Sequence, residues 1–422
     1  MRPHPLLSLR WVSRDAKLII SVRGVRTFAQ SYVAILLALY LDQLGFSLFQ
    51  IGAFLSVGVA GAAFFAFLVG LMAERLGRRR LLVAFTLTSA AAGVALFFIN
   101  DFLPLVLFAF LGSLTGGSGG GAGGPIQPLE QATLPDTAPD EKRTDLFAVY
   151  GIAGTGGAAL GALAAGLPTL YQGAFGMSVI SAYKVMFVAF ALILVIGALL
   201  YSFLSPVVEG GGTGQRWINP LQLPSRRLIF TLTGLFSVDH FAGSLVIQSL
   251  VAYWFSTKFG IQLGGLAFVF FLSHILAAIS LWLAAKTANK IGLLNTMVFT
   301  HIPSSIFLIA AAFAPTAWAA VLFWQLRSFL GQMDVPTRDS YTMAVVGPNE
   351  RVAMATIHIV GRSMSGTAGP SVATALWNAL SASAPLITCG ILKIAYDLSL
   401  YVMFRNVRPP EEEKRVKDRA IV

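Results

Sequence analysis

The sequence contains few charged residues and a single cysteine. Charged residues make up 12% of its 422 residues, about half of the 25% that is usual in soluble globular domains. This shortage argues against a soluble enzyme, and also against intrinsic disorder, because a disordered chain combines low hydrophobicity with high net charge. Cys389 is the only cysteine, so a disulfide within the chain is excluded.

Apolar residues are abundant instead, and they gather in long runs. Hydrophobic residues make up 56% of the chain, and its 41 glycines and 32 phenylalanines fit a helical protein embedded in lipid. A helix needs about 20 mostly apolar residues to cross a bilayer, and the alternating pattern of a membrane β-barrel is absent. We therefore predict an all-α membrane protein with twelve transmembrane helices. The predicted spans cover residues 24–43, 48–72, 80–99, 103–134, 144–168, 180–205, 227–256, 263–287, 293–313, 317–346, 352–378 and 385–404.

The basic residues indicate how the predicted helices are oriented. With the N-terminus in the cytoplasm, 22 of the 30 Lys and Arg residues fall on cytoplasmic segments, and Lys184 and Lys258 fall on the opposite side. The other six lie within the spans or at their edges. Cytoplasmic segments are enriched in Lys and Arg, so we predict that both termini are cytoplasmic. The net charge of +11 then reflects orientation in a lipid bilayer rather than a nucleic-acid partner.

Two sequence features divide the chain into similar halves. Residues 206–226 are polar and rich in Gly and Pro, and we interpret them as a cytoplasmic linker between six-helix halves at 1–205 and 227–422. The halves also match each other at a nearly fixed offset, which indicates an internal repeat. Gly77 and Gly292 occupy similar loops 215 residues apart. A second match, at an offset of 209 residues, pairs Glu130, Thr133, Pro139 and Glu141 with Asp339, Thr342, Pro348 and Glu350.

The loop at residues 70–80 carries a family resemblance. It reads Gly-Leu-Met-Ala-Glu-Arg-Leu-Gly-Arg-Arg-Arg and resembles the loop signature of the major facilitator superfamily, G-x-x-x-D-R-x-G-R-R-R, with Glu74 where the family usually has Asp. The resemblance implies a secondary transporter with two pseudo-symmetric halves, whose spans 1, 4, 7 and 10 line a central cavity. It also implies that this loop is a conformational latch. We assign that role to Gly70, Glu74, Arg75, Gly77, Arg78 and Arg79.

Polar residues inside the predicted spans are the candidates for transport. A charge at the centre of a membrane costs from about 3 to over 10 kcal/mol, so each should face water or a partner. Their spacing forms polar stripes along spans one, four, seven, ten and eleven. Arg362 in span eleven should need an acidic partner, for which Asp239 and Asp334 are possibilities. The candidates for substrate binding or proton coupling are Arg26, Gln30, Gln127, Glu130, Asp239, His240, Gln248, Arg327, Asp334, Arg338 and Arg362.

Span ten has charged residues at a helical spacing. Arg327, Asp334 and Arg338 follow one another at intervals of seven and four residues, with Gly331 between the first two, which puts them on one helix face. Asp334 and Arg338 also have the acid-first i, i+4 order that favours pairing. We interpret Arg327 as a substrate or charge-relay residue, and a buried structural ion network is the alternative.

Span seven carries a stripe of hydroxyl, imidazole and amide side chains. Asp239 and His240 are its candidates for proton coupling, because His changes charge near neutral pH and burial can make a carboxylate retain its proton. A histidine that only packs one helix against another is the alternative. The stripe consists of Thr233, Ser237, His240, Ser244 and Gln248, with Asp239 at its edge.

Other ionisable residues in the spans have a structural interpretation. Lys393 and Asp397 of span twelve are spaced as an i, i+4 pair, and span twelve is peripheral in the family that the loop resembles. We therefore expect a structural ion pair between them. His274 and His301 stand alone in their spans, and we expect both to be structural.

The expected activity is transport rather than catalysis. The sequence contains no nucleophile elbow, paired-carboxylate motif, Walker motif or metal-binding cluster, so we expect no enzyme activity, cofactor or metal. Arg26, Arg327 and Arg362 outnumber the acidic residues deep in the spans, which favours an organic anion as the substrate class. With Asp239 and His240 as the groups that couple protons, we predict proton-coupled movement of a small solute by alternating access. Alternatives are proton-driven efflux of amphipathic compounds and a non-transporting receptor on the same fold. Efflux is weakened because span five lacks the internal Gly-Pro motif that is typical of drug/proton antiporters in the superfamily that the loop resembles. We expect a monomer in the cell membrane, and the compact loops and tails suggest a bacterial inner membrane.

Neutralising Glu74 tests the latch assignment. The variant Glu74→Gln removes the carboxylate while it keeps the size of the side chain, so it should shift the balance of inward- and outward-facing conformations and lower transport. Solute flux in proteoliposomes, together with the labelling of cysteines introduced on each side, measures both effects. Unchanged flux and labelling would refute the latch.

Overall fold

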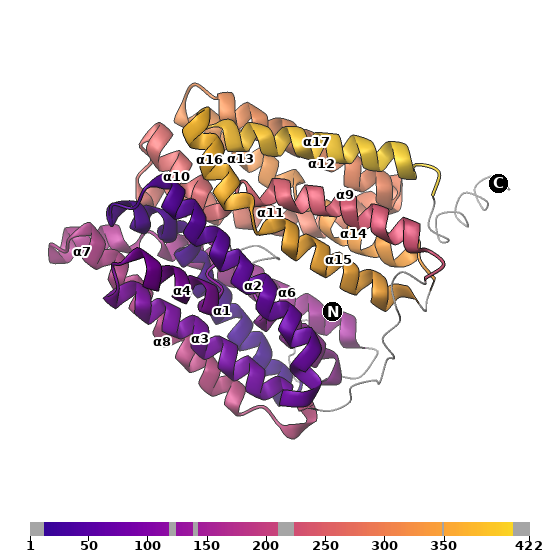
Figure 1. Cartoon of the computed structure of the whole chain (residues 1–422), viewed down its shortest axis with the longest axis horizontal. Coiled ribbons are helices and arrows are strands. Elements are labelled where there is room, and N and C mark those ends of the chain that lie inside the picture. Colours follow the sequence, from indigo (N-terminus) through magenta and orange to yellow (C-terminus); the bar gives the residue numbers. More distant parts are fainter. Residues whose placement is uncertain (1–11, 118–123, 138–141, 210–222, 348–349, 408–422) are drawn as a thin grey trace, which may run out of the picture. The chain divides into compact units, whose positions relative to one another are not determined.

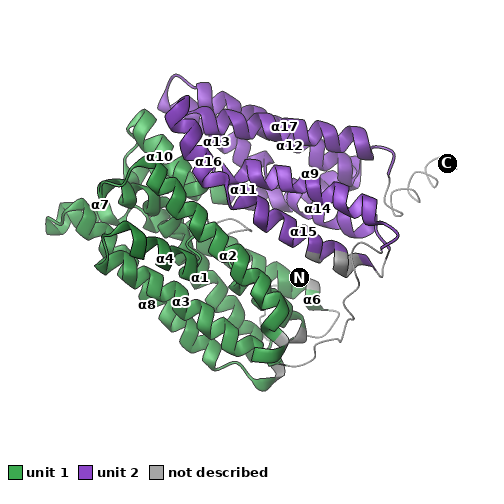
Figure 2. Ribbon diagram, viewed as in Figure 1, with its two compact units in different colours: residues 1–215, 247–274 green, residues 216–246, 275–422 purple. Residues whose placement is uncertain are grey.

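All regular structure in the described part of the chain is helical (Figure 1), which confirms the all-α prediction. The helices form two compact units (Figure 2): unit 1 is residues 1–215 with 247–274, and unit 2 is residues 216–246 with 275–422. The structure is a computed structural model, and it describes residues 12–117, 124–137, 142–209, 223–347 and 350–407.

Unit 1 holds the helices of the first half of the chain together with a segment from the second half. That segment includes α10 (Gln248–Phe259), where the Tyr253 hydroxyl donates a hydrogen bond to Asp42 Oδ1 at 2.8 Å. Helix α11 (Leu263–Ile291) contributes residues to both units. The remaining helices of unit 1 are α1 (Arg14–Gln43), α2 (Leu48–Leu76), α3 (Arg78–Phe98), α4 (Phe102–Gly112), α5 (Ile126–Thr133), α6 (Arg143–Ala164), α7 (Leu167–Phe175) and α8 (Val179–Ser202).

Unit 2 contains the helix that follows the predicted linker and the helices after α11. Its apolar core includes the buried rings of Phe236, Tyr341 and Tyr396. The predicted linker at 206–226 lies mostly outside the described residues, so the division of the chain at that segment stays a prediction. The helices of unit 2 are α9 (Arg226–Ser244), α12 (Leu293–Phe313), α13 (Ala317–Leu330), α14 (Asp334–Ala344), α15 (Arg351–Gly366), α16 (Gly369–Ala379) and α17 (Ala384–Phe404).

Several predicted spans are single, continuous helices. They are α1, α2, α3, α8, α11, α12 and α17. Helix α1 begins at Arg14, well before residue 24, because the Ser13 hydroxyl accepts a hydrogen bond from the Ala16 N–H at 3.1 Å and caps the helix. Within the described ranges, nine helical segments are long and apolar enough to cross a membrane. The total of twelve spans and the cytoplasmic termini stay predictions.

The other five predicted spans each contain two helices with a break between them. Four of the breaks precede a proline in the first turn of the second helix. Proline lacks an N–H and clashes with the preceding turn, so a helix accommodates it best at its start. Pro128 and Pro336 are the third residues of α5 and α14, while Pro168 and Pro370 are the second residues of α7 and α16. The broken pairs are α4 and α5, α6 and α7, α9 and α10, α13 and α14, and α15 and α16.

The two loops that the repeat matches share a backbone conformation. Gly77 lies between α2 and α3 with φ +88°, and Gly292 lies between α11 and α12 with φ +91°. A residue with a Cβ is strained at such positive φ values, which explains why glycine stands at both positions. The correspondence supports the predicted repeat.

Glycines let α6 approach α1 closely within unit 1. A Cβ placed on Gly161 would lie 2.0 Å from the carbonyl oxygen of Phe28, and one on Gly157 would lie 2.2 Å from that of Gly24. A side chain at either position would therefore push the two helices apart. Gly156, in the same helix, has nothing within 4 Å of its Cβ position.

We expect Gly161→Ala to destabilise the protein and Gly156→Ala to leave it unchanged or slightly more stable. The methyl group at residue 161 overpacks the contact between α1 and α6, which typically costs about 1–3 kcal/mol. At residue 156 only helix propensity changes, and it favours alanine by about 1 kcal/mol. Thermal unfolding of both variants in detergent measures the difference, and equal unfolding midpoints would contradict the close packing.

Candidate functional site

Unit 1 contains a buried ion pair between its first and fourth spans. Arg26 of α1 donates from Nη2 to Glu130 Oε2 of α5 at 2.6 Å. The side chains are 1% and 0% exposed, so water does not screen their charges. Glu130 lies two residues after Pro128, in the helix that restarts after the break in span four. The structure thus brings together two predicted site residues from different spans.

Two tyrosines complete the surroundings of the Glu130 carboxylate. Tyr150 of α6 donates its hydroxyl hydrogen to Oε2 at 2.7 Å, and Tyr201 of α8 donates to Oε1. With Arg26 they provide three donors, one of them charged, and charge-assisted hydrogen bonds are the strong ones. Sequence analysis missed both tyrosines, because their partner lies on another helix and no spacing along the chain indicates it.

Arg23 lies beside this pair without a carboxylate of its own. Its Nη1 donates to Gln127 Oε1 at 3.4 Å, and its guanidinium carbon lies 5.0 Å from the centre of the Tyr150 ring. Arg26 donates from Nη1 to Gln30 Oε1 at 3.2 Å. The buried Nε atoms of both arginines have no hydrogen-bond partner among the described residues. This part of unit 1 therefore holds two guanidinium groups and one carboxylate.

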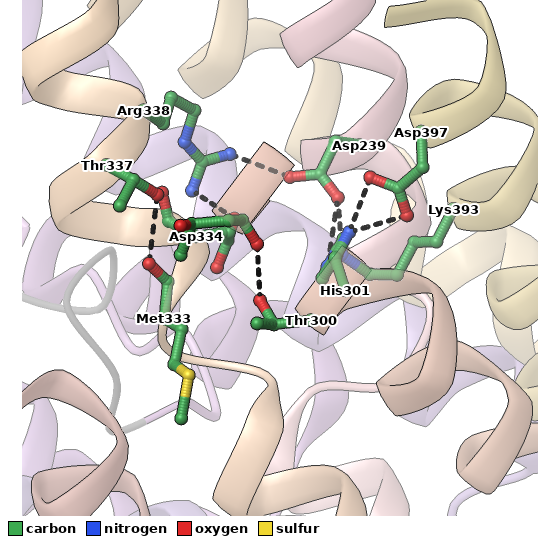
Figure 3. A network of polar contacts seen from close by, with 10 residues as sticks. Asp239, Thr300, His301, Met333, Asp334, Thr337, Arg338, Lys393 and Asp397 are labelled. Carbon is green, nitrogen blue, oxygen red and sulfur yellow. Dashed lines mark hydrogen bonds and ion pairs between the residues drawn. The ribbon is translucent and has the colours of Figure 1, made fainter. Parts of the chain in front are cut away.

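Unit 2 contains a larger buried network around Asp239 (Figure 3). Arg338 Nη1 of α14 donates to Asp239 Oδ2 at 2.8 Å, and Lys393 Nζ of α17 donates to Oδ1 at 2.5 Å. Arg338 Nη2 also lies 3.1 Å from Asp334 Oδ2, which confirms the pair predicted from the i, i+4 spacing. Several helices of unit 2 are thus tied together by charged side chains.

His301 and Asp397 extend this network. His301 Nδ1 of α12 lies 3.1 and 3.0 Å from the two carboxylate oxygens of Asp397, and Lys393 Nζ lies 3.3 Å from His301 Nε2. The predicted pair between Lys393 and Asp397 is wrong, because each has a buried partner on another helix. The interpretation of His301 as isolated is wrong for the same reason. The name Asp239 network is used below for Asp239, His301, Asp334, Arg338, Lys393 and Asp397.

The polar stripe predicted for span seven faces a neighbouring helix of unit 2. A Cβ on Gly361 of α15 would lie 2.6 Å from the Thr233 side chain, and one on Gly366 would lie 2.9 Å from the His240 ring. This close contact favours the helix-packing interpretation of His240. Gln248 is not part of the stripe, because it begins α10 after the break that ends α9.

Arg327 and Arg362 have no carboxylate partner in the described part of unit 2. The Arg327 guanidinium carbon lies 4.6 Å from the centre of the Trp324 ring, and the buried Nε of Arg362 has no hydrogen-bond partner there. The expected partners of Arg362, Asp239 and Asp334, pair within the Asp239 network instead. Arg327 and Asp334 do not share one helix face, because α13 ends and α14 begins between them.

The predicted latch loop is held by contacts within unit 1. Arg79 donates from its backbone N–H to Glu209 Oε1 at 3.2 Å and from Nη1 to the Leu204 carbonyl at 3.0 Å. Arg78 donates from Nη1 to the Ala132 carbonyl at 3.1 Å. These bonds anchor the start of α3 to the ends of α5 and α8.

Among the described residues, the structure gives no contact that supports a latch role for Gly70, Glu74 or Arg75. Gly70 has nothing within 4 Å of its Cβ position, so no close approach requires a glycine there. Arg75 is exposed, and the side chain of Glu74 lies outside the described residues. The latch role of the loop therefore stays a prediction.

The two units carry their ion pairs on corresponding spans with opposite polarity. In unit 1 the cation is on span one and the carboxylate on span four, whereas in unit 2 Asp239 is on span seven and Arg338 on span ten. Arg338 lies two residues after Pro336, just as Glu130 lies two residues after Pro128. Within the described residues, no group of three or more His, Cys, Asp or Glu side chains is placed to hold a metal.

Comparison with known proteins gives both sequence and structural matches. A family model described as Major Facilitator Superfamily matches residues 19–333. The uncharacterized membrane protein YJR124C of Saccharomyces cerevisiae is 24% identical over 439 residues, which cover 96% of this chain and 98% of that protein. The nucleoside transporter NupG has a TM-score of 0.69 at 16% identity, with 93% of this chain and 99% of that chain covered. A D-xylose-proton symporter has a TM-score of 0.70 at 12% identity, with 93% and 98% covered.

Replacing Arg26 alone or Glu130 alone should destabilise the protein, and replacing both should destabilise it by less than the sum of the two single losses. Arg26→Met or Glu130→Gln alone leaves a buried group without its partner, which costs about 3–5 kcal/mol for an uncompensated charge, while replacing both partners can be nearly neutral. Thermal unfolding of the two single variants and the double variant in detergent measures this. If the double variant loses the sum of the two single losses, the groups do not interact.

Proposed function

This chain belongs to the major facilitator superfamily, and on that premise we propose that it moves a small organic anion across the membrane by alternating access, driven by protons. Family membership identifies a multi-pass membrane transporter rather than an enzyme. Because the sequence identity to the solved transporters is low, their similarity supports the fold and gives no information about the substrate. The proposal of an anionic substrate therefore rests on the buried charges of this chain.

Arginines without a carboxylate partner carry the proposal. Arg23 in unit 1 and Arg327 and Arg362 in unit 2 make no ion pair within 4.0 Å among the described residues, whereas Glu130 and Asp239 are each paired with a cation. A guanidinium group inside a membrane is costly without a counter-charge, and its fork of donors matches a carboxylate or a phosphate. A negatively charged solute would supply the missing charge.

The construction of each unit supports alternating access. Each unit has its own apolar core and its own buried ion pair, so it can move as a body. The ion pairs lie at helix breaks, with Glu130 and Arg338 both in helices that restart at a proline. Discontinuous helices at the substrate site are common in secondary transporters. The latch loop fits the same cycle, because its contacts join three helix ends of one unit.

Other features of the protein stay predictions. The monomeric state and the bacterial inner membrane are among them, and the yeast relative lends no support to a bacterial origin. Efflux of amphipathic compounds stays the alternative activity, and the charge of the solutes that bind separates it from transport of an anion.

A thermal-stability screen of the purified protein tests the substrate class. Anionic, neutral and cationic organic solutes of similar size are added to the protein in detergent. A ligand present at 100 times its Kd stabilises the folded state by about 2.7 kcal/mol, so anions should raise the unfolding midpoint and cations should not. Stabilisation by cationic or neutral amphipathic compounds alone would overturn the proposal and favour efflux.

The same screen on two arginine variants provides the control. Arg362→Gln should weaken the binding of a stabilising anion, because a hydrogen bond to a charged group contributes about 1.5–3 kcal/mol, which corresponds to a Kd about 10 to 150 times higher. Arg405→Gln removes the same charge from an exposed position after α17 and should leave the Kd unchanged. Equal Kd values for the two variants would exclude Arg362 from the site.

A further inference from the structure

We propose that the pair of His301 and Asp397 in unit 2 is the site that binds the coupling proton. The inference rests on the proposed proton-coupled transport and names the residues that hold the proton. It transfers this role from Asp239 and His240, which the sequence suggests, to a pair on α12 and α17. Neither residue of the pair was a candidate for the site in the sequence.

The Asp239 network holds more carboxylates than permanently charged cations. Buried ions are costly unless their charges are compensated. Counted on its own members alone, the network has three carboxylates and two permanent cations, and a single bound proton balances them. The carboxylates are Asp239, Asp334 and Asp397, and the cations are Arg338 and Lys393.

Asp397 is the carboxylate that lacks a permanently charged partner. The other two carboxylates each have an arginine or lysine nitrogen within 3.1 Å. In the described part of unit 2, Asp397 pairs with His301, which is charged only when it is doubly protonated. The Asp397 side chain is 1% exposed, so water cannot stabilise its charge. The proton that balances the network therefore belongs to this pair.

The contacts of His301 indicate which of its nitrogens is free to take up the proton. The Lys393 ammonium group has donors but no acceptor, so its 3.3 Å contact makes His301 Nε2 the acceptor. A neutral imidazole that accepts at Nε2 carries its hydrogen on Nδ1, which donates to Asp397 at 3.0 Å. With the hydrogens assigned in this way, the contacts drawn in Figure 3 correspond to a neutral His301.

Protonation of His301 would change the contacts between helices. A hydrogen on Nε2 turns this atom into a donor, so it can no longer accept from Lys393. Asp239 Oδ1, at 3.8 Å from Nε2, is the nearest carboxylate oxygen that can accept instead. His301 of α12 then exchanges its contact with Lys393 of α17 for one with Asp239 of α9. Asp239 is also the residue through which Arg338 joins α14 to α9. Proton binding is thereby linked to the packing of the helices that carry the network.

The surroundings of His301 are rich in charged and titratable groups. Histidine is the side chain whose charge ordinarily changes between about pH 5 and 8, so a proton can bind and leave under physiological conditions. The groups around it are Asp239 from α9, Asp334 from α14, and Lys393, Tyr396 and Asp397 from α17. Arg327 from α13, Arg338 from α14 and Cys389 from α17 interact electrostatically with Asp239.

Asp239 and His240 are less suited to hold the proton. Asp239 has cation nitrogens at 2.5 and 2.8 Å, which favour its ionised form. His240 makes no ion pair with a carboxylate within 4.0 Å among the described residues, and Arg362 adds positive charge nearby. Its ring lies against Gly366 of α15, where it packs two helices together.

The pH dependence of thermal stability tests proton binding without any solute. The full-length protein in detergent is unfolded at several pH values between about pH 5 and 8. If the folded pair binds a proton more tightly than the unfolded chain does, the pair's contribution to stability falls as the pH rises, by the equivalent of one proton. Asp397→Asn removes the negative charge of this pair, so the unfolding midpoint of the wild type should lose several degrees relative to that of Asp397→Asn as the pH rises over this range.

Two further variants keep the test decisive. His301→Arg supplies a permanent cation, should behave as Asp397→Asn does, and replaces it if Asp397→Asn does not fold. Arg405→Gln, which removes a charge from an exposed position outside the network, is the control and should keep the wild-type pH dependence. The same pH dependence in the wild type and in the network variants overturns the proposal. Because no solute is present, either result leaves the anion screen to be judged separately.

Discussion

The burial of charged side chains in an apolar environment is the constraint on which the rest of this structure depends. Each unit places a carboxylate and a guanidinium group from two different spans in direct contact, Arg26 with Glu130 and Arg338 with Asp239. An ion of this kind is costly to bury unless its partner is well placed. The helix that carries Glu130 and the helix that carries Arg338 both restart at a proline two residues earlier. The breaks in spans four and ten thus belong to the construction of the ion pairs.

The same constraint separates structural charges from those available for transport. Glu130 is satisfied by an arginine and two tyrosine hydroxyls, so it stabilises unit 1 in a fixed arrangement. The arginines that remain without a carboxylate are the groups to which an anionic solute can bind. The Asp239 network of unit 2, counted without Arg327 and Arg362, has one carboxylate more than it has permanent cations. Unit 1 has Arg23 beside its ion pair, whereas unit 2 has Arg327 and Arg362 without a carboxylate and also a place for a proton at His301 and Asp397.

Local features of the sequence predicted much of the fold and part of the site. Long apolar runs located the helices, and the loop at 70–80 indicated the family. The Asp334–Arg338 contact followed from an i, i+4 spacing within one helix. Contacts between helices did not follow, because Arg26 and Glu130 are 104 residues apart and Asp239 and Lys393 are 154 apart, and a single sequence carries no sign of such pairs. Four of the five helix breaks were predictable in principle from the prolines, but apolar residues on both sides concealed them.

Anion flux in proteoliposomes with an imposed pH gradient tests the central claim most directly. The measurement uses an anion that stabilises the purified protein, and it compares accumulation with and without the gradient at the same anion concentration. The account predicts accumulation above the equilibrium level when the gradient is present, and simple equilibration when it is absent. Flux of neutral or cationic compounds alone, or anion flux that does not respond to the gradient, would contradict it.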